Sequence, residues 1–278
     1  MLSLYVSVAG ITEQTADQIY VIVNGPCKED GEVQNFREIQ YEFNGETASF
    51  GYCIQATTPV NYIGSTLTFK MYIKDTNGNL IQQGDTYGFS MEDYFNKLTA
   101  STNERVREVG NAVLCYGKAA ANYFNCAENA YMYDISDTVA DMKSTYGLSA
   151  DKLDETFGNK VPTFTPDEGK VSLVLDTKVA LRCYCTYFPY IKNLTEIGGF
   201  PVLEDKNGMY FEVSGISPNQ MLNYGISFSI GDTTFNYCCL TWPYRVLSNP
   251  DLADSKLGDL AVGFYAYAKS VSGLRMPS

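Results

Sequence analysis

FGYCIQATTPVNYIGSTLTFKM, residues 50–71, aligns without a gap on MYFEVSGISPNQMLNYGISFSI, residues 209–230. Pro59 falls on Pro218, and the apolar positions on either side of this pair coincide as well. A shared pattern of apolar positions indicates a shared pattern of buried faces. We therefore interpret the chain as one structural unit that is used twice.

The alignment resumes nearer the end of each unit, where 116–118 (Tyr-Gly-Lys) fall on 267–269 (Tyr-Ala-Lys). A length difference lies between the two aligned blocks, at the turn that contains Asn77-Gly78 in the first unit. Asn-Gly is a strong hairpin signal, and surface turns tolerate changes of length. The two units thus differ where a difference is least costly.

Alternating apolar residues predict strands in each unit, and helical periodicity follows them. We predict an α+β chain that is mainly β: two homologous antiparallel β-sandwich lobes, each followed by a C-terminal amphipathic helix. The first lobe with its helix spans 1–126, a linker with a short helix spans 127–166, and the second lobe with its helix spans 167–278. The predicted strands are 4–8, 19–23, 39–43, 49–55, 66–73, 79–83, 172–175, 179–187, 209–213, 224–230 and 234–240.

Helix starts are marked by capping residues. Ser90 followed by Asp93 predicts the start of a short helix, and Ser101 or Asn103 predicts the start of a longer one. The longer helix carries Gly110 and Gly117 on one face, which favours close packing against a bulky neighbour, expected to be the sheet. Its predicted apolar stripe is Val106, Val109, Val113, Ala120 and Phe124, and that of the second lobe is Leu257, Leu260, Ala261, Phe264 and Val271. The linker is predicted to contain a helix from Ser136 to Tyr146.

The formal net charge of −12 argues against nucleic-acid binding, because phosphate contacts require clustered basic residues. It equally disfavours anionic membranes, and no apolar run approaches the ~20 residues that a membrane span needs. We expect a monomer without membrane insertion. The first residues lack a basic leader and read as a strand, so we expect a piece of a longer protein.

The chain contains no histidine, which excludes Ser-His-Asp, Cys-His and His-ligated metal sites. Its eight cysteines include no Cys-x-x-Cys pair, so we expect no metal and no cofactor. Free buried thiols are favoured for most cysteines, and a bridge between Cys115 and Cys126 stays open as an alternative. Carboxylate catalysis of the glycosidase kind survives this elimination, but no local motif singles out a pair of acids.

The string from Val113 to Asn125, VLCYGKAAANYFN, resembles the "YG-x-AA-x-YF" helix of large cell-wall and surface proteins of gut Firmicutes, the ruminococci and Lachnospiraceae. The resemblance implies a non-catalytic extracellular module, attached to the cell surface or wall through segments outside this chain. Some similar surface proteins bind host immunoglobulin.

Loop aromatics are enriched at protein interfaces, and the ring of Trp242 can stack on a sugar, so these side chains are the ligand-binding candidates. The candidates are Tyr131, Tyr133, Tyr187, Phe188, Tyr190 and Trp242. Packing between the lobes is an equal alternative for the first five, and filling a gap in the second lobe is favoured for Trp242. Residues 75–79 resemble part of a calcium loop, but a hairpin turn is favoured there.

The leading functional hypothesis is a surface module of the adhesin kind that binds a host protein such as an immunoglobulin and catalyses no reaction. A glycan-binding module is the first alternative. A structural spacer that binds nothing is the second.

Overall fold

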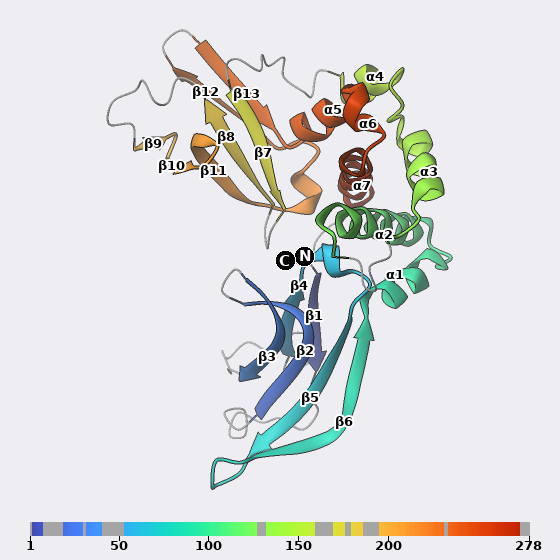
Figure 1. Ribbon diagram of the computed structural model, residues 1–278, viewed down its shortest axis with the longest axis vertical. Helices are drawn as coiled ribbons and strands as arrows, with labels where there is room; N and C mark the ends of the chain where they lie inside the picture. Colours follow the sequence, from blue (N-terminus) through green and yellow to red (C-terminus); the bar gives the residue numbers. More distant parts are fainter. Residues whose placement is uncertain are drawn as a thin grey trace.

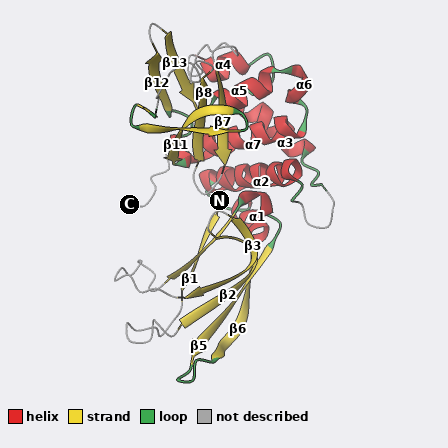
Figure 2. Ribbon diagram, turned by 60° about the vertical axis from the view of Figure 1, so that its left-hand side comes forward, coloured by secondary structure: helices red, strands yellow, loops and turns green. Residues whose placement is uncertain are grey.

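The computed structural model of the chain describes residues 2–7, 19–29, 32–40, 53–126, 132–158, 169–175, 179–185, 195–230 and 233–272. The fold is α+β, with antiparallel sheets and a group of helices (Figure 1). Strands from the first part of the chain lie at one end of the molecule and strands from the last part at the other (Figure 2). The helices lie between the two groups of strands and along one side.

In the first part of the chain, the described residues form two antiparallel sheets and two helices. One sheet pairs the first and fourth strands, and the other has the order β3-β2-β5-β6. The elements are β1 (Leu2–Ser7), β2 (Ile19–Glu29), β3 (Glu32–Gln40), β4 (Cys53–Thr58), the 3-10 turn η2 (Val60–Tyr62), β5 (Thr66–Lys74), β6 (Leu80–Ser90), α1 (Met91–Thr99) and α2 (Glu104–Phe124).

Two helices follow, and then a five-stranded sheet of order β7-β8-β11-β10-β9, a separate hairpin and three more helices. These elements are α3 (Ser136–Tyr146), α4 (Leu153–Phe157), β7 (Gly169–Leu175), β8 (Val179–Cys185), β9 (Glu196–Ile197), β10 (Phe200–Asp205), β11 (Gly208–Ile216), η6 (Pro218–Gln220), β12 (Gly225–Ile230), β13 (Thr233–Cys238), α5 (Thr241–Ser248), α6 (Pro250–Ala253) and α7 (Lys256–Val271). The helix expected within the linker is confirmed as α3.

The order of elements recurs along the chain. β4-η2-β5-β6-α1-α2 in the first part corresponds to β11-η6-β12-β13-α5-α7 in the second, with α6 added. Part of the strand pairing recurs with it, because β5 pairs with β6 and the corresponding β12 pairs with β13, both antiparallel. The aligned sequence stretches thus fold into the same succession of elements.

The predicted helix caps are confirmed. The Ser90 side chain accepts the backbone N–H of Asp93 at the start of α1. Asn103 caps α2 by accepting the backbone N–H groups of Arg105 and Val106. These bonds satisfy N–H groups that have no partner within the helix, so each cap fixes where its helix begins.

The two long helices, α2 and α7, pack against each other and form the centre of the main core. Gly263 permits the contact, since a Cβ added there would lie 2.7 Å from Cα of Tyr116. Beside this point the rings of Tyr116 and Tyr267 stack, with centroids 5.7 Å apart and planes 6° from parallel. These two tyrosines occupy the same position in the sequence repeat, so equivalent helix faces meet, as in an isologous contact between identical subunits.

The expectation that α2 lies with its glycines against the sheet is wrong. A Cβ at Gly110 would meet Leu98 and Phe95 of α1, and one at Gly117 would meet Ile63, which follows η2. The small residues therefore admit a helix and a turn, because a periodic pattern identifies a packed face without identifying its neighbour. The sheet β3-β2-β5-β6 contacts the helices mainly where β6 meets α1, which follows it directly in the chain.

Replacing Gly263 by alanine is expected to lower the free energy of unfolding by about 1–3 kcal/mol, the usual effect of overpacking. The new Cβ would collide with backbone atoms of Tyr116, which cannot rotate away as a side chain does. Equilibrium unfolding in urea measures the change. Gly88→Ala is the matched control, because a Cβ there has no neighbour closer than 4.0 Å. Equal losses in the two variants would contradict a close helix contact.

Candidate binding groove beside the linker

A groove of about 420 Å³ lies where the residues before α3, α3 itself, the last turns of α2 and the start of α7 meet. Its floor is apolar, with Ile135 and Val139 buried, and its walls carry both acidic and basic side chains. It is lined by Asn122, Met132, Tyr133, Asp134, Ile135, Ser136, Val139, Ala140, Lys143, Asp254, Lys256 and Asp259. The groove therefore offers apolar contact together with charge.

Asn122 fastens the linker to α2. Its side chain donates to the carbonyl of Tyr133 over 2.9 Å and accepts the backbone N–H of Tyr133 over 2.8 Å. Asn122 is itself buried, and hydrogen bonds in such a place are costly to remove. The buried amide thus sets the path by which the chain enters α3.

The ring of Tyr133 is also held. Lys118 places its Nζ 5.3 Å from the ring centroid and forms an ion pair with Glu92 over 2.6 Å. A Cβ added at Gly64 would collide with the Tyr133 hydroxyl, so glycine leaves the space that this ring occupies. Tyr133 is half-buried and lines the groove.

The charges of the groove are partly compensated among themselves. Lys143 donates to the carbonyl of Ala253 over 3.2 Å and to Asp254 over 2.9 Å. Ser136 donates its hydroxyl and its backbone N–H to Asp134, which lowers the pKa of that carboxyl. These bonds connect α3 with the α6–α7 turn and leave Asp259 as the remaining acid of the groove.

Asp259 lies near the start of α7 and is half-buried. Burial raises the pKa of its carboxyl, nearby Lys143 lowers it and Asp254 raises it again, and the net direction is upward. Desolvation disfavours the charged form of a carboxylate, so this side chain would gain from a cation placed beside it.

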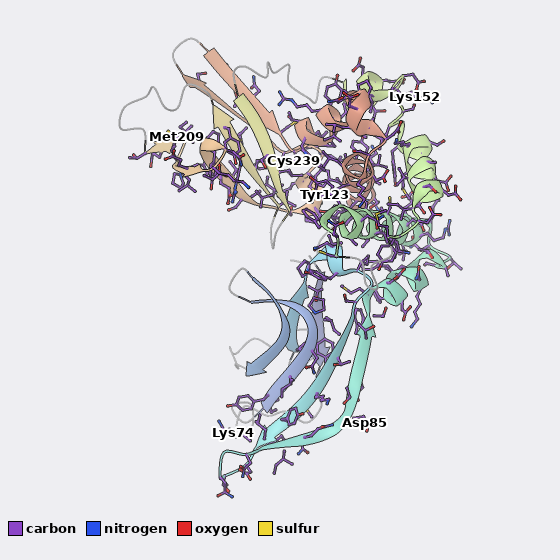
Figure 3. All side chains as sticks on the ribbon, viewed as in Figure 1. Lys74, Asp85, Tyr123, Lys152, Met209 and Cys239 are labelled. Carbon is purple, nitrogen blue, oxygen red and sulfur yellow. The ribbon has the colours of Figure 1, made fainter. Side chains whose placement is uncertain are left out.

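Exposed apolar side chains occur at the end of α2 and in the segment before α3. Phe124 is 52% exposed and Met132 61% exposed. Tyr123, labelled in Figure 3, is exposed too and meets Phe124 edge to face, with ring centroids 5.0 Å apart. The expectation that Phe124 belongs to the buried stripe is wrong, because the buried run of α2 ends at Asn122 and the last two residues project beyond the core.

The predicted site residues fall in different places. Tyr133 lines the groove, whereas Trp242 is half-buried against the main core and meets Phe264 edge to face, with centroids 5.7 Å apart. The remaining candidates, Tyr131, Tyr187, Phe188 and Tyr190, lie outside the described residues. Sequence reasoning missed Asn122, Lys143 and Asp259, which have no motif in common.

The turn at residues 75–79 is confirmed as a hairpin turn. Asp75 accepts the backbone N–H groups of Asn77 and Asn79, each over 2.8 Å, and the side-chain amide of Asn79 over 3.1 Å. These bonds lower the pKa of Asp75. Its oxygens are used by the turn itself, as in other Asx turns.

The cysteines whose side chains are described are free thiols, so a bridge between Cys115 and Cys126 is wrong. Burial raises the pKa of Cys115 and of Cys239 to about 12. Thiols of this kind stay protonated and unreactive. Within the described ranges, no three His, Cys, Asp or Glu side chains gather to hold a metal ion, and no helix is long and apolar enough to cross a bilayer.

Substituting Asn122 by alanine removes both hydrogen bonds to the Tyr133 backbone, and the free energy of unfolding is expected to fall by about 2 kcal/mol. Amide exchange at Tyr133 should become faster than in the parent chain. Thermal unfolding and hydrogen exchange measure the two effects. Asn96→Ala, at an exposed position of α1, is the control and should change neither quantity appreciably. If amide exchange at Tyr133 is unchanged in Asn122→Ala, the two hydrogen bonds from Asn122 are not what holds this segment in place.

Asp259→Asn tests the direction of the carboxyl pKa. A raised folded-state pKa means that the folded chain binds this proton more tightly than the unfolded chain. The associated stability is present below the usual value of 3.8 and is lost as the pH rises through the raised pKa. We therefore expect Asp259→Asn to match the parent at pH 3.5 and to be more stable at pH 7, as measured by urea unfolding at both.

Asp141→Asn is the control for that experiment, because Asp141 is exposed and is not among the charges that shift the pKa of Asp259. A parent that gains stability relative to Asp259→Asn between pH 4 and 7 would contradict the raised pKa.

Comparisons of the chain with protein-family models, with curated proteins and with solved structures found no match.

Proposed function

We propose that the chain is a non-catalytic binding module of a bacterial surface protein, and that it contacts a host macromolecule, with immunoglobulin as the first candidate. The observation that carries the proposal is a set of exposed apolar side chains: Met132, which lines the groove, and Tyr123 and Phe124, which follow the groove residue Asn122 at the end of α2. Exposed apolar and aromatic groups that adjoin one another mark interaction sites. The resemblance of the α2 sequence to surface-protein helices supports the bacterial and extracellular part of the proposal.

The same proposal includes the architecture of two homologous β-sandwich lobes, each with its own helices. The repeated order of elements supports it, as does the antiparallel pairing of β5 with β6 and of β12 with β13. The stacked Tyr116 and Tyr267 support it further, because the two copies meet through the same position. A stiff pair of lobes suits a module that presents a binding surface away from the cell.

Binding is favoured over catalysis by the state of the groove acids. A glycosidase of the common kind needs one protonated and one ionised carboxyl group, both facing the sugar. Asp254 is instead paired with Lys143, which also bonds the carbonyl of Ala253 and thereby joins α3 to the α6–α7 turn. We assign these charges to holding the helices together, which leaves Asp259 without a matched partner acid.

A protein partner suits the groove better than a small polar ligand. The apolar floor and the exposed Met132 favour an apolar side chain, and Asp259 favours a neighbouring cation. Lysine and arginine side chains combine an aliphatic stem with a positive end. The net charge of −12 attracts such a partner and repels an acidic one.

A glycan ligand is the second candidate, and the exposed ring pair of Tyr123 and Phe124 favours it, since flat apolar rings stack on sugars. A spacer without a ligand is the third candidate. Capture from human serum and mucosal secretions, run beside a glycan array, separates the three.

We expect the immobilised chain to capture a protein, and Phe124→Ala to weaken that capture about tenfold, as truncation of a central interface residue does. Surface plasmon resonance with the captured protein measures the affinity. Leu203→Ala is the control, because it removes an exposed apolar side chain from β10, outside the groove. Equal effects of the two substitutions would place the contact elsewhere. If serum, secretions and the glycan array all give no signal, the spacer without a ligand is the remaining candidate.

A further inference from the structure

We infer that the free edge of β6 accepts an extended segment of another polypeptide as an added strand, with apolar side chains at alternate positions and a neutral or basic charge. This inference rests on the proposed function, for which it names a contact surface distinct from the groove.

β6 is the last strand in the order β3-β2-β5-β6. It pairs with β5 from Leu80 opposite Lys74 to Ser90 opposite Thr66, and no described strand pairs with its other side. Figures 1 and 2 place β6 along the margin of the molecule. An edge of this kind presents backbone N–H and C=O groups that can pair with an incoming strand.

The edge lacks most of the features that normally block such pairing. Of its eleven residues, LIQQGDTYGFS, only Asp85 is charged, and none is lysine or proline. Charged side chains, proline and covering helices are the usual protection of an exposed edge. Figure 3 places the Asp85 side chain at the outer margin of the sheet, far from the helices.

One protective feature is present, a bulge in the middle of the strand. Gln83 pairs with Met71 and Tyr87 with Phe69, so three residues of β6 lie opposite one residue of β5. Gly84 adopts a positive φ of +69° within it. The bulge divides the edge into two short pairing segments, 80–83 and 87–90, and so limits the length of regular pairing on either side.

The apolar face of the sheet continues onto β6 without cover. Tyr87 lies opposite Phe69 and on the same face, but Phe69 is 4% exposed and Tyr87 is 70% exposed. Ile81, opposite Ile73 on that same face, is 51% exposed. An added strand would place alternate side chains beside Tyr87 and Ile81 and would extend the buried face by one strand.

Charge selects the occupant. A second copy of this chain would bring another net charge of −12 and a second Asp85 to the edge, which opposes self-pairing. A segment of a different polypeptide with lysine or arginine at its ends is attracted instead. In this mode of recognition the backbone bonds supply affinity and the alternate side chains supply selectivity.

The test uses the full chain and a fluorescein-labelled peptide, Lys-Val-Thr-Val-Thr-Val-Thr-Val-Lys. We expect binding by fluorescence anisotropy, and amide protection in β6 that rises when the peptide is added. Ile81→Lys and Tyr87→Lys place a charge at the edge and should each weaken binding about tenfold or more. Leu203→Lys is the matched control and should bind as the parent does. A peptide with glutamate at both ends should bind more weakly than the lysine peptide.

Two results would overturn the inference. One is peptide affinity that the Ile81→Lys and Tyr87→Lys substitutions leave unchanged, or no peptide binding at all. The other is protection, in the isolated protein, of the β6 amides that point away from β5, which would mean that the edge is already occupied. Light scattering would then identify a second copy if one is present.

The experiments distinguish an error in the β6 edge site from an error in the proposed function. Capture of a host protein that depends on Phe124, by a chain whose β6 edge binds no peptide, would overturn the edge site alone. A β6 edge that binds the peptide, in a chain that captures no host protein, would overturn the proposed function alone.

Discussion

The contact between α2 and α7 is the constraint on which the rest of the structure depends. Two helices pack backbone against backbone only where a side chain is missing at the contact. Gly263, which has no Cβ, lies directly against the backbone of Tyr116. The main core then forms around the helix pair, with side chains from α3, α4, α5, β8 and β11. Because both halves of the chain contribute to one core, separating them would expose buried apolar surface on each.

The elements were predictable from sequence because they depend on local signals. Apolar alternation, the Asn77-Gly78 turn and the caps at Ser90 and Asn103 act over a few residues, so each identifies an element without reference to the rest of the chain. The partner of a helix face is not a local property. Gly110 and Gly117 predict a closely packed face of α2. The neighbours of that face are α1 and Ile63, whereas the pattern led us to expect a sheet.

The groove was beyond sequence reasoning for the same reason. Lys143 reaches the carbonyl of Ala253, 110 positions further along the chain, and no spacing rule relates two such residues. The side-chain amide of Asn122 bonds to the backbone of Tyr133, and no sequence motif indicates such a bond. Tyr133 was selected as a loop aromatic, and the neighbourhood of Lys118 and Gly64 explains how its ring is fixed in the groove. Long-range polar contacts become visible only once the chain has folded.

The β6 edge and the groove are connected through elements that contact one another in succession. β6 ends at Ser90, which caps α1, and the backbone N–H of Glu92 bonds to the carbonyl of Ile63 over 3.1 Å. α1 in turn packs on α2 at Gly110, and α2 ends at the groove through Asn122. A strand added at the edge and a side chain bound in the groove would thus contact the same connected set of elements. Two modest contacts of one partner would then reinforce each other, because the second forms at the high effective concentration that the first creates.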